Sequence, residues 1–334
     1  MAGMTDTRKE CLIYISWASD CARSDGIAKK LGGKSFMIYS GFWGSRYSTI
    51  VFKYISQVIK TFRVLFRERP RFVFVMTPPV AACFPVWLYA RLTAGAYAID
   101  AHTAAFLDPR WRSIIFLHRF FSRHARTTIV TNEYLKGIVT AWGATATIVG
   151  DVPIDFVEAK IVQFIDKTKM TFISSFTKDE PLSLFCEAAK RLPQIQFYVT
   201  GDFRSAGPRI VQAKPKNVEF TGFLSKSEYA GLLLDSDAII CLTTLDHTMQ
   251  RGAYEAVYLG KPVVTSNTEV LKNSFAKGAV HVDCTVDSIV EGILKMQSNL
   301  KTYQDEVRQL RQEKLNKWEA VENELRLLIW QDAN

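Results

Sequence analysis

Short apolar runs, rich in β-branched and aromatic residues, recur along the chain with helix-like stretches between them. The runs are continuously apolar rather than alternating, which is typical of parallel strands buried on both faces. Strands are predicted at residues 11–17, 35–39, 72–77, 97–100, 127–131 and 145–149, and again at 170–175, 196–200, 218–221, 238–242, 262–265 and 279–282. Two such series in tandem predict an α/β protein with two Rossmann-like domains.

The domain boundaries follow from the gap between the two series. A chain of 334 residues is long enough for two domains with a core each. We expect an N-terminal Rossmann-like domain over residues 1–152, a linker over 153–169 and a second domain over 170–315. Residues 316–334 are expected to form a C-terminal helix that packs back toward the N-terminal domain.

One apolar segment, residues 72–90, is long enough to resemble a membrane span. Three prolines interrupt it, so it is interpreted as a strand, a Pro-Pro loop and a buried helix. The six cysteines form no C-x-x-C pair, and the polar N-terminus lacks the apolar core of a signal peptide. These features predict a cytoplasmic protein.

The net charge of +9 is unevenly distributed. Residues 1–165 hold 21 Lys and Arg against 11 Asp and Glu, whereas residues 166–334 hold 21 against 22. The excess therefore lies in the N-terminal half. It predicts a polyanionic partner for that half alone, which is nucleic acid, an anionic membrane surface or a phosphate-bearing substrate.

Two N-terminal segments without any acid concentrate this charge. In residues 46–67, Lys53, Lys60 and Arg67 recur every seven positions and share one helical face. Residues 110–126 carry five arginines, among them Arg119 and Arg123, with four aromatic residues. Such segments suit an anionic bilayer or a phosphorylated acceptor, and an ordinary domain helix with a lysine-rich exterior is the alternative for the first. No known nucleic-acid-binding motif accompanies them, so nucleic acid is not the expected partner.

The most informative stretch is 217–266, which reads strand, Thr-Gly-Phe loop, helix, strand, polar loop, helix and strand. The loop 243–252 follows a strand and leads into a helix whose N-terminus offers free N–H groups and partial positive charge. Arg251 adds a bidentate phosphate donor, and Glu255 can accept bonds from ribose hydroxyls. This arrangement predicts a nucleotide-diphosphate site.

The same stretch carries a resemblance. The order V-E-F-T-G-F-L, Y-A-G-L-L-L-D-S-D-A-I-I and Y-E-A-V-Y-L-G-K-P-V-V-T-S resembles the donor half of retaining nucleotide-sugar glycosyltransferases with the two-Rossmann GT-B fold. It is similar to the family-4-like branch that adds sugars to lipid-linked cell-surface glycans. The resemblance implies a hexosyltransferase of polysaccharide biosynthesis with its nucleotide-sugar site in the cleft between the domains. It also implies a peripheral protein of the inner face of the cell membrane.

The resemblance assigns roles in the donor domain. Glu255 matches the second Glu of the E-x7-E motif, which holds the nucleotide ribose, but His247 stands where the first Glu is expected. His247 is the catalytic candidate that takes over the contact of this Glu to the donor sugar, and the alternative is that Asp246 beside it makes the contact. The remaining assignments are Gln250, Arg251 and Gly252 to the diphosphate, Gly222 and Phe223 to the base, and Lys178 in place of the family's early Arg and Lys.

In the N-terminal half, the segment 97–103, YAIDAHT, resembles the strand that delivers the family's active-site His, which assigns His102 to catalysis. The Gly-Gly loop after the first strand is missing, and Arg23 is placed there as a phosphate-binding residue on the acceptor side.

No cofactor and no metal is expected. Asp235 and Asp237 form a D-x-D pattern, but they fall at a helix end where the family has a structural Asp. Arg251 and a helix N-terminus can stabilise the leaving diphosphate without a metal. One alternative is a nucleotide-sugar epimerase of the same fold. The other is a non-catalytic membrane- or glycan-binding GT-B protein, which the absence of the first Glu and of the Gly-Gly loop suggests.

Overall fold

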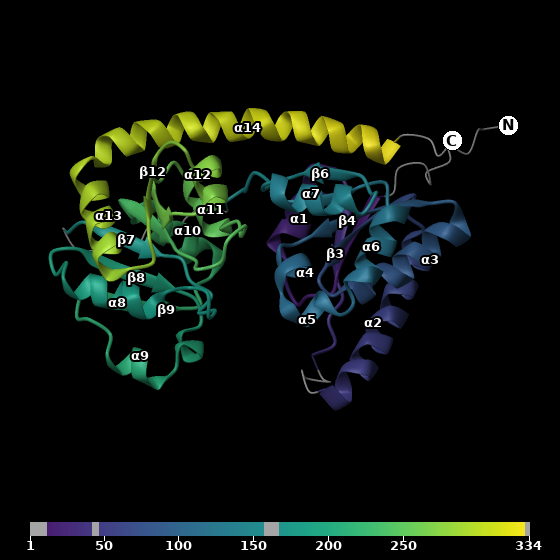
Figure 1. Ribbon diagram of the computed structural model, residues 1–334, viewed down its shortest axis with the longest axis horizontal. Coiled ribbons are helices and arrows are strands. Elements are labelled where there is room, and N and C mark those ends of the chain that lie inside the picture. The colour runs from purple at the N-terminus through teal and green to yellow at the C-terminus, as the bar shows by residue number, and fades with distance from the viewer. Residues whose placement is uncertain (1–11, 42–46, 157–166, 331–334) are drawn as a thin grey trace. The chain divides into compact units, whose positions relative to one another are not determined.

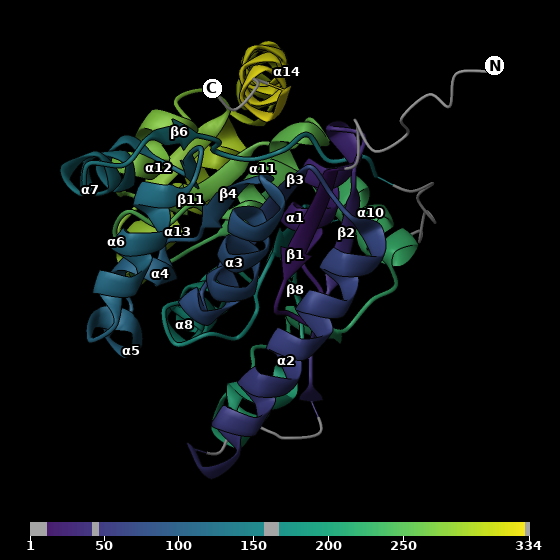
Figure 2. The ribbon, with the colours of Figure 1, turned by 90° about the vertical axis from the view of Figure 1, so that its right-hand side faces the viewer.

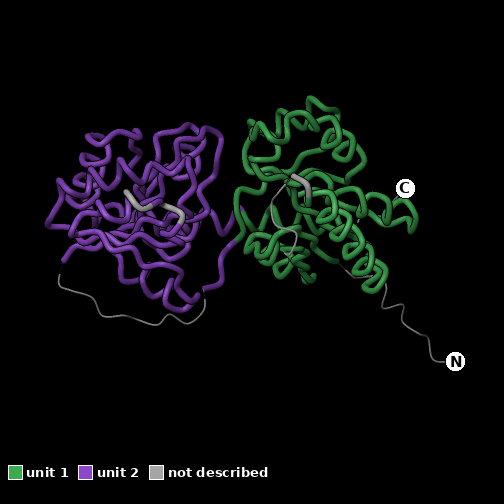
Figure 3. The backbone as a smooth tube through the Cα atoms, turned by 90° about the horizontal axis from the view of Figure 1, so that it is seen from below, with its two compact units in different colours: residues 1–152, 318–334 green, residues 153–317 purple. Residues whose placement is uncertain are grey.

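The computed structural model describes residues 12–41, 47–156 and 167–330. The chain divides into two compact units, coloured separately in Figure 3. Unit 1 comprises Met1–Val152 and Trp318–Asn334, and unit 2 comprises Pro153–Lys317. Each unit holds a six-stranded sheet in which the recorded strand pairs are parallel (Figure 1).

The sheet of unit 1 has the order β2-β1-β3-β4-β5-β6. Its strands are β1 (Leu12–Ser16), β2 (Lys34–Met37), β3 (Phe72–Thr77), β4 (Ala96–Ala101), β5 (Thr128–Val130) and β6 (Ala146–Ile148). The helices are α1 (Ala22–Lys30), α2 (Tyr47–Glu68), α3 (Cys83–Thr93), α4 (Ala104–Leu107), α5 (Pro109–Arg112), α6 (Ile115–His124) and α7 (Glu133–Ala141), with a 3₁₀ turn at Val80–Ala82 before α3.

Alternate residues of these strands face two separate apolar layers. Ile13 and Val73 point into the core covered by α2, α3 and α6 (Figure 2). Leu12 and Phe72 point to the opposite core, which α1 covers together with Trp318, Leu325 and Ile329 of the C-terminal helix. Burial on both faces explains why the strands are continuously apolar in sequence.

The sheet of unit 2 has the order β12-β11-β10-β7-β8-β9. Its strands are β7 (Lys169–Phe172), β8 (Gln196–Thr200), β9 (Val218–Gly222), β10 (Ala238–Cys241), β11 (Val263–Ser266) and β12 (Ala279–Val282). The helices are α8 (Leu182–Lys190), α9 (Pro208–Gln212), α10 (Lys226–Asp235), α11 (Arg251–Tyr258), α12 (Glu269–Ser274) and α13 (Val286–Ser298), with a 3₁₀ turn at Phe203–Ala206. Helix α14 (Leu300–Trp330) begins in unit 2, and its residues from Trp318 onward belong to unit 1.

The twelve predicted strands all occur within the described ranges, at boundaries within a few residues of those expected. The segment 72–90 is strand β3, a loop and helix α3, which confirms its interpretation as part of the fold. None of the helices in the described ranges has the length and apolarity needed to span a bilayer.

Candidate nucleotide-sugar site

The strand order of unit 2 defines where a ligand is expected. From β7 the chain proceeds to β8 and β9 on one side, and then crosses to β10 on the other side of β7. The loops after β7 and β10 therefore leave the carboxyl edge of the sheet in opposite directions. Open α/β sheets bind ligands outside the strand ends at such a switch point. The polar loop 243–250, which the sequence singled out, follows β10 at this position.

Helix α11 begins very close to these strand ends because Gly252 has no side chain. A Cβ at Gly252 would lie 2.9 Å from Cys241 Sγ and 3.0 Å from Ile173 Cβ, at the ends of β10 and β7. Gln250 is the N-cap, and its side chain makes no capping bond. The first N–H groups of a helix have no partner within the helix, so α11 presents donors and partial positive charge at the switch point.

Glu255, one turn into α11, is held in place by two side chains. Tyr229 of α10 donates its hydroxyl to Glu255 Oε2 at 2.5 Å, and Arg251 Nε lies 3.2 Å from Oε1. The side chain of Glu255 is 15% exposed and that of Arg251 is 35% exposed. Burial and the charge of Glu255 raise the pKa of Tyr229 well above its usual value, so the tyrosine remains a donor. The carboxylate and guanidinium are thus oriented and reachable.

The loop after β7 is tied to the loop after β10. Thr243 Oγ1 donates to Asp179 Oδ2 at 2.8 Å, and the amide of Thr244 donates to the Asp179 carbonyl at 2.8 Å. Within the β7 loop, Glu180 accepts from Ser174 Oγ at 2.6 Å and from the Ser175 amide at 3.0 Å. The two loops therefore form one connected polar edge. Lys178 lies at its exposed tip.

The other donor-side candidates lie on the same edge of the sheet. His247 sits in the β10 loop with a positive φ of 58°, a conformation that side chains other than glycine rarely adopt. Gly222 ends β9 with a φ of 72°, and Phe223 beyond it is 81% exposed. Strained backbone and an exposed aromatic ring at the carboxyl edge are features of binding loops.

In unit 1, His102 also follows a strand at the carboxyl edge. It comes directly after β4, and its amide donates to the carbonyl of Thr77 at the end of β3 at 2.9 Å. Two residues earlier on β4, the buried Asp100 accepts from Tyr14 at 2.5 Å. The backbone position of His102 is thus fixed by the two central strands of the sheet.

The prediction that Arg23 lies on an acceptor-facing surface is wrong. Its guanidinium is buried, donates to both oxygens of Asp100, and reaches the Val149 carbonyl at 2.9 Å and the Gly150 carbonyl at 3.3 Å. Burial raises the pKa of Asp100, but the charge of Arg23 outweighs it and holds that pKa below its usual value. Arg23 is therefore a structural ion-pair partner.

The other basic candidates lie on the helices that cover one face of unit 1. Lys60, Arg67, Arg119 and Arg123 are exposed, and Lys53 is half-buried with its ammonium 4.7 Å from the ring centre of Tyr39. Lys60 also donates to Ser40 Oγ at 3.0 Å, and Arg67 pairs with Glu68 at 2.8 Å.

Helix α2 is oriented differently from an ordinary amphipathic domain helix. Its buried side includes the polar residues Gln57 and Thr61, which bond the Ile38 carbonyl and the indole N–H of Trp17. Large apolar side chains point outward instead, namely Val51, Phe52, Ile55, Ile59 and Phe66, each between 46% and 59% exposed. We call these five residues the α2 apolar stripe. The exterior of α2 is therefore apolar as well as basic, unlike the lysine-rich alternative.

The carboxylates of the D-x-D pattern both contact Lys169. Asp235 Oδ2 pairs with the Lys169 ammonium at 2.8 Å, and Asp237 Oδ2 accepts from the Lys169 amide at 2.9 Å. They thereby join the end of α10 to the start of β7. Within the described ranges, no group of three or more His, Cys, Asp or Glu side chains is arranged to hold a metal ion.

Comparison with known proteins agrees with this architecture. Residues 155–313 match the family described as "Glycosyl transferases group 1". Among solved structures, sucrose-phosphate synthase from Thermosynechococcus elongatus superposes with a TM-score of 0.74 at 12% identity, covering 96% of this chain and 98% of that one.

Two further structures carry bound nucleotide. HepE from Anabaena, solved with UDP and glucose, has a TM-score of 0.66 at 10% identity and coverage of 95% and 98%. MnaA from S. aureus, solved with UDP, has a TM-score of 0.62 at 13% identity and coverage of 97% and 99%. No curated protein matches the sequence.

The fold is the two-Rossmann fold of the GT-B class, as the sequence predicted. The match to the group 1 glycosyltransferase family covers nearly all of unit 2.

Sequence reasoning missed the residues that hold the site together. Tyr229 lies 26 positions from Glu255, and Asp179 lies 64 positions from Thr243. Neither has a local pattern that predicts its partner. The sequence indicates these contacts only indirectly. The loops after β7 and β10 were both expected at the carboxyl ends of strands, where parallel topology brings distant segments together.

Proposed function

We propose that the protein is a retaining glycosyltransferase that transfers a hexosyl group from a nucleoside-diphosphate sugar to a hydroxyl of a glycan or lipid-linked acceptor. The observation that carries the proposal is the polar edge of unit 2, where Gly252 brings the N-terminus of α11 against the ends of β7 and β10. Arg251 and Glu255 stand on the first turns of that helix. UDP-sugars are the first donors to test, because HepE and MnaA were solved with UDP.

For each part of the nucleotide-sugar donor, the site offers a residue of matching chemistry. The α11 N-terminus and Arg251 stabilise the negative charge that develops on the departing diphosphate. Glu255, oriented by Tyr229, accepts hydrogen bonds from the ribose hydroxyls. Gly222 and Phe223 contact the base, Gln250 and Lys178 support the diphosphate, and His247 and His102 contact the sugar. The acceptor hydroxyl attacks from the face that the diphosphate leaves, and no metal takes part.

The acceptor side is proposed to be the face of unit 1 covered by α2, α3 and α6. The α2 apolar stripe and the cations Lys53, Lys60 and Arg67 occupy the exterior of one helix. Apolar side chains insert between lipids while the cations meet anionic headgroups, each worth about 1 kcal/mol near the surface. This exterior supports peripheral binding to an anionic membrane, and we propose that the membrane surface is the cytoplasmic face and that the product is a surface polysaccharide.

The donor proposal is tested by isothermal titration calorimetry with UDP-, GDP- and dTDP-sugars. Tryptophan fluorescence would not suffice, since all seven tryptophans belong to unit 1. Glu255→Gln should weaken binding about tenfold, because a hydrogen bond to a charged group is lost. Glu187→Gln, at an exposed position of α8, is the matched control. Absence of binding to every nucleotide sugar would refute the proposal.

Product analysis separates the alternatives. Transfer to an added acceptor with the anomeric configuration of the donor preserved is expected. Conversion of the donor sugar without acceptor would establish an epimerase instead, and tight donor binding without any turnover would favour the non-catalytic protein.

A further inference from the structure

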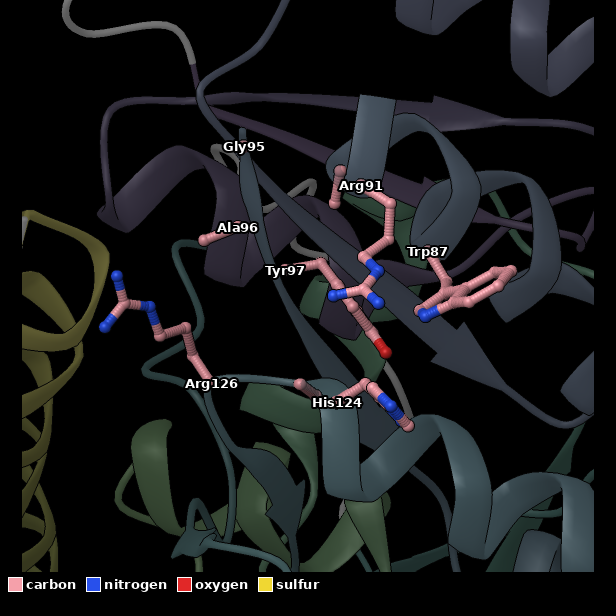
Figure 4. A pocket seen from close by; sticks show the side chains of 9 residues that line it. Trp87, Arg91, Gly95, Ala96, Tyr97, His124 and Arg126 are labelled. Atoms are coloured by element: carbon pink, nitrogen blue, oxygen red, sulfur yellow. The ribbon is translucent and has the colours of Figure 1, made fainter. Parts of the chain in front are cut away.

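A second concave site lies in unit 1, at the sheet edge opposite His102. The pocket has a volume of about 290 Å³ and is shown in Figure 4. It is bounded by the last turns of α3, the start of β4 and the end of α6. Among its nine lining residues, Trp87, Arg91, Tyr97, His124 and Arg126 carry its chemistry. Because His102 follows the carboxyl end of β4, this pocket is separate from the catalytic candidates.

The charge of the pocket wall has one sign. Arg91 and Arg126 line it, and none of the nine lining residues is acidic. Both α3 and α6 end here, and a helix C-terminus contributes about half a negative charge. The two helix ends together contribute about one negative charge, which favours cations there but does not cancel two guanidinium groups. The pocket therefore attracts an anion.

The indole nitrogen of Trp87 gives the pocket a buried donor. Trp87 Nε1 is inaccessible to solvent and has no hydrogen-bond partner among the described residues. Figure 4 shows it turned toward the guanidinium of Arg91, across the pocket from His124. Two donors that face each other without an acceptor leave a hydrogen bond unmade, and an unsatisfied buried N–H is costly. An acceptor oxygen placed between them would satisfy both.

Two of the lining side chains already use a polar atom in a hydrogen bond within the protein. Tyr97 already donates its hydroxyl to the Phe121 carbonyl at 2.7 Å, and His124 Nδ1 donates to the Phe120 carbonyl at 2.8 Å. These groups form a fixed wall. On the outer side, the exposed rings of Phe84 and Phe120 pack on Trp87 at centroid distances of 6.5 and 5.6 Å. These two rings do not line the pocket themselves but hold the Trp87 ring in place beside it.

We propose that this pocket binds a phosphate group, with Arg91 and Trp87 as its principal donors and Arg126 at the other end. A phosphate has enough acceptor oxygens for the Arg91 guanidinium and the Trp87 indole N–H together, and arginine matches its geometry bidentately. The volume leaves room for a small organic group beyond the phosphate. The ligand is a phosphorylated small molecule or the headgroup of a phosphorylated lipid, whose chains would leave past Phe84 and Phe120.

The test compares soluble and membrane-bound phosphate. Inorganic phosphate and glycerol phosphate are titrated by calorimetry, and flotation is measured with phosphatidylcholine vesicles with and without phosphatidic acid. Arg91→Gln should weaken binding about tenfold or more, and Trp87→Phe, which keeps the ring and removes the N–H, about fivefold. Arg63→Gln, at an exposed position of α2 outside the pocket, is the matched control.

The donor site in unit 2 also attracts phosphate, so each titration is repeated in an Arg251→Gln background. The pocket predicts that Arg91→Gln weakens binding in both backgrounds, and failure of the donor proposal would leave this result unchanged. Loss confined to the vesicle arm identifies a lipid headgroup, and loss in the soluble arm identifies a free phosphorylated ligand. Binding that Arg91→Gln and Trp87→Phe leave unchanged, or that Arg63→Gln weakens equally, overturns the proposal.

Discussion

Replacing Arg23 with methionine tests how the buried Asp100 of unit 1 is stabilised. The variant keeps much of the side-chain volume but removes both contacts to Asp100 and the two donated to the carbonyls of Val149 and Gly150. Breaking a buried ion pair by removing one partner costs about 3–5 kcal/mol. Because domains are stable by only about 5–15 kcal/mol, a large fraction of the stability of unit 1 is at stake.

The dependence on pH gives the prediction a second signature. In the wild type the pKa of Asp100 is lowered, so its contribution to stability is present above the carboxyl pKa of the unfolded chain, about 3.9, and is lost as pH falls through the lower folded value. In Arg23→Met, burial acts without the cation and raises that pKa. The folded variant then takes up a proton at mildly acidic pH. The stability deficit should therefore be largest near neutrality and shrink as pH falls.

The assay is urea unfolding followed by tryptophan fluorescence, which reports on unit 1 alone because all seven tryptophans belong to it. If Arg23→Met does not fold, the double variant Arg23→Met/Asp100→Asn supplies the comparison, since it has no buried charge and should recover much of the loss. A cost below about 1 kcal/mol that is independent of pH would mean that Arg23 faces solvent, and the reasoning would be refuted.

Other predictions address the two units separately. Gly252→Ala places a carbon 2.9 Å from Cys241 Sγ, so α11 must shift, and donor affinity measured by calorimetry should fall about tenfold while unit 1 unfolds as before. Ile59→Glu should weaken flotation with anionic vesicles about tenfold without lowering stability, since Ile59 is 46% exposed; a stability loss above 1 kcal/mol would contradict this. Burial lowers the pKa of His118 to about 4 from 6.5, so unit 1 should lose about 3 kcal/mol as pH falls between these values, and His118→Gln should flatten that part of the profile.

The fold was predictable because its signals are local and repeated. Every strand of both sheets carries its own apolar run, and the switch from one series to the next marks the two units. The placement of Glu255 and Arg251 on the first turns of a helix after β10 was predictable for the same reason. Whether they and the other candidates bind a donor stays a prediction.

The sequence does not show which polar residues, far apart in the chain, pair with each other in the fold. Arg23 and Asp100 are 77 positions apart, and an arginine after the first strand is equally compatible with phosphate binding and with a buried ion pair. Only the parallel pairing of β1, β3 and β4, which brings the two regions together, distinguishes them.

Helix α2 is a second case, in which the sequence does not show which face of a helix packs against the core. Periodicity predicts that its apolar and basic residues lie on different sides, but it cannot say which side meets the core. Gln57 and Thr61 face inward, where they bond the Ile38 carbonyl and the Trp17 indole N–H, and Leu65 is buried beside them. The five residues of the α2 apolar stripe remain about half exposed on the other side. Because these side chains are about half exposed, each forfeits about half of the roughly 1.5–3 kcal/mol that complete burial would contribute. The stripe lies next to cations, and no acidic residue of α2 precedes Glu68. This free energy of burial is recovered only when another apolar surface covers the stripe, which is the physical reason to look for the acceptor on this face.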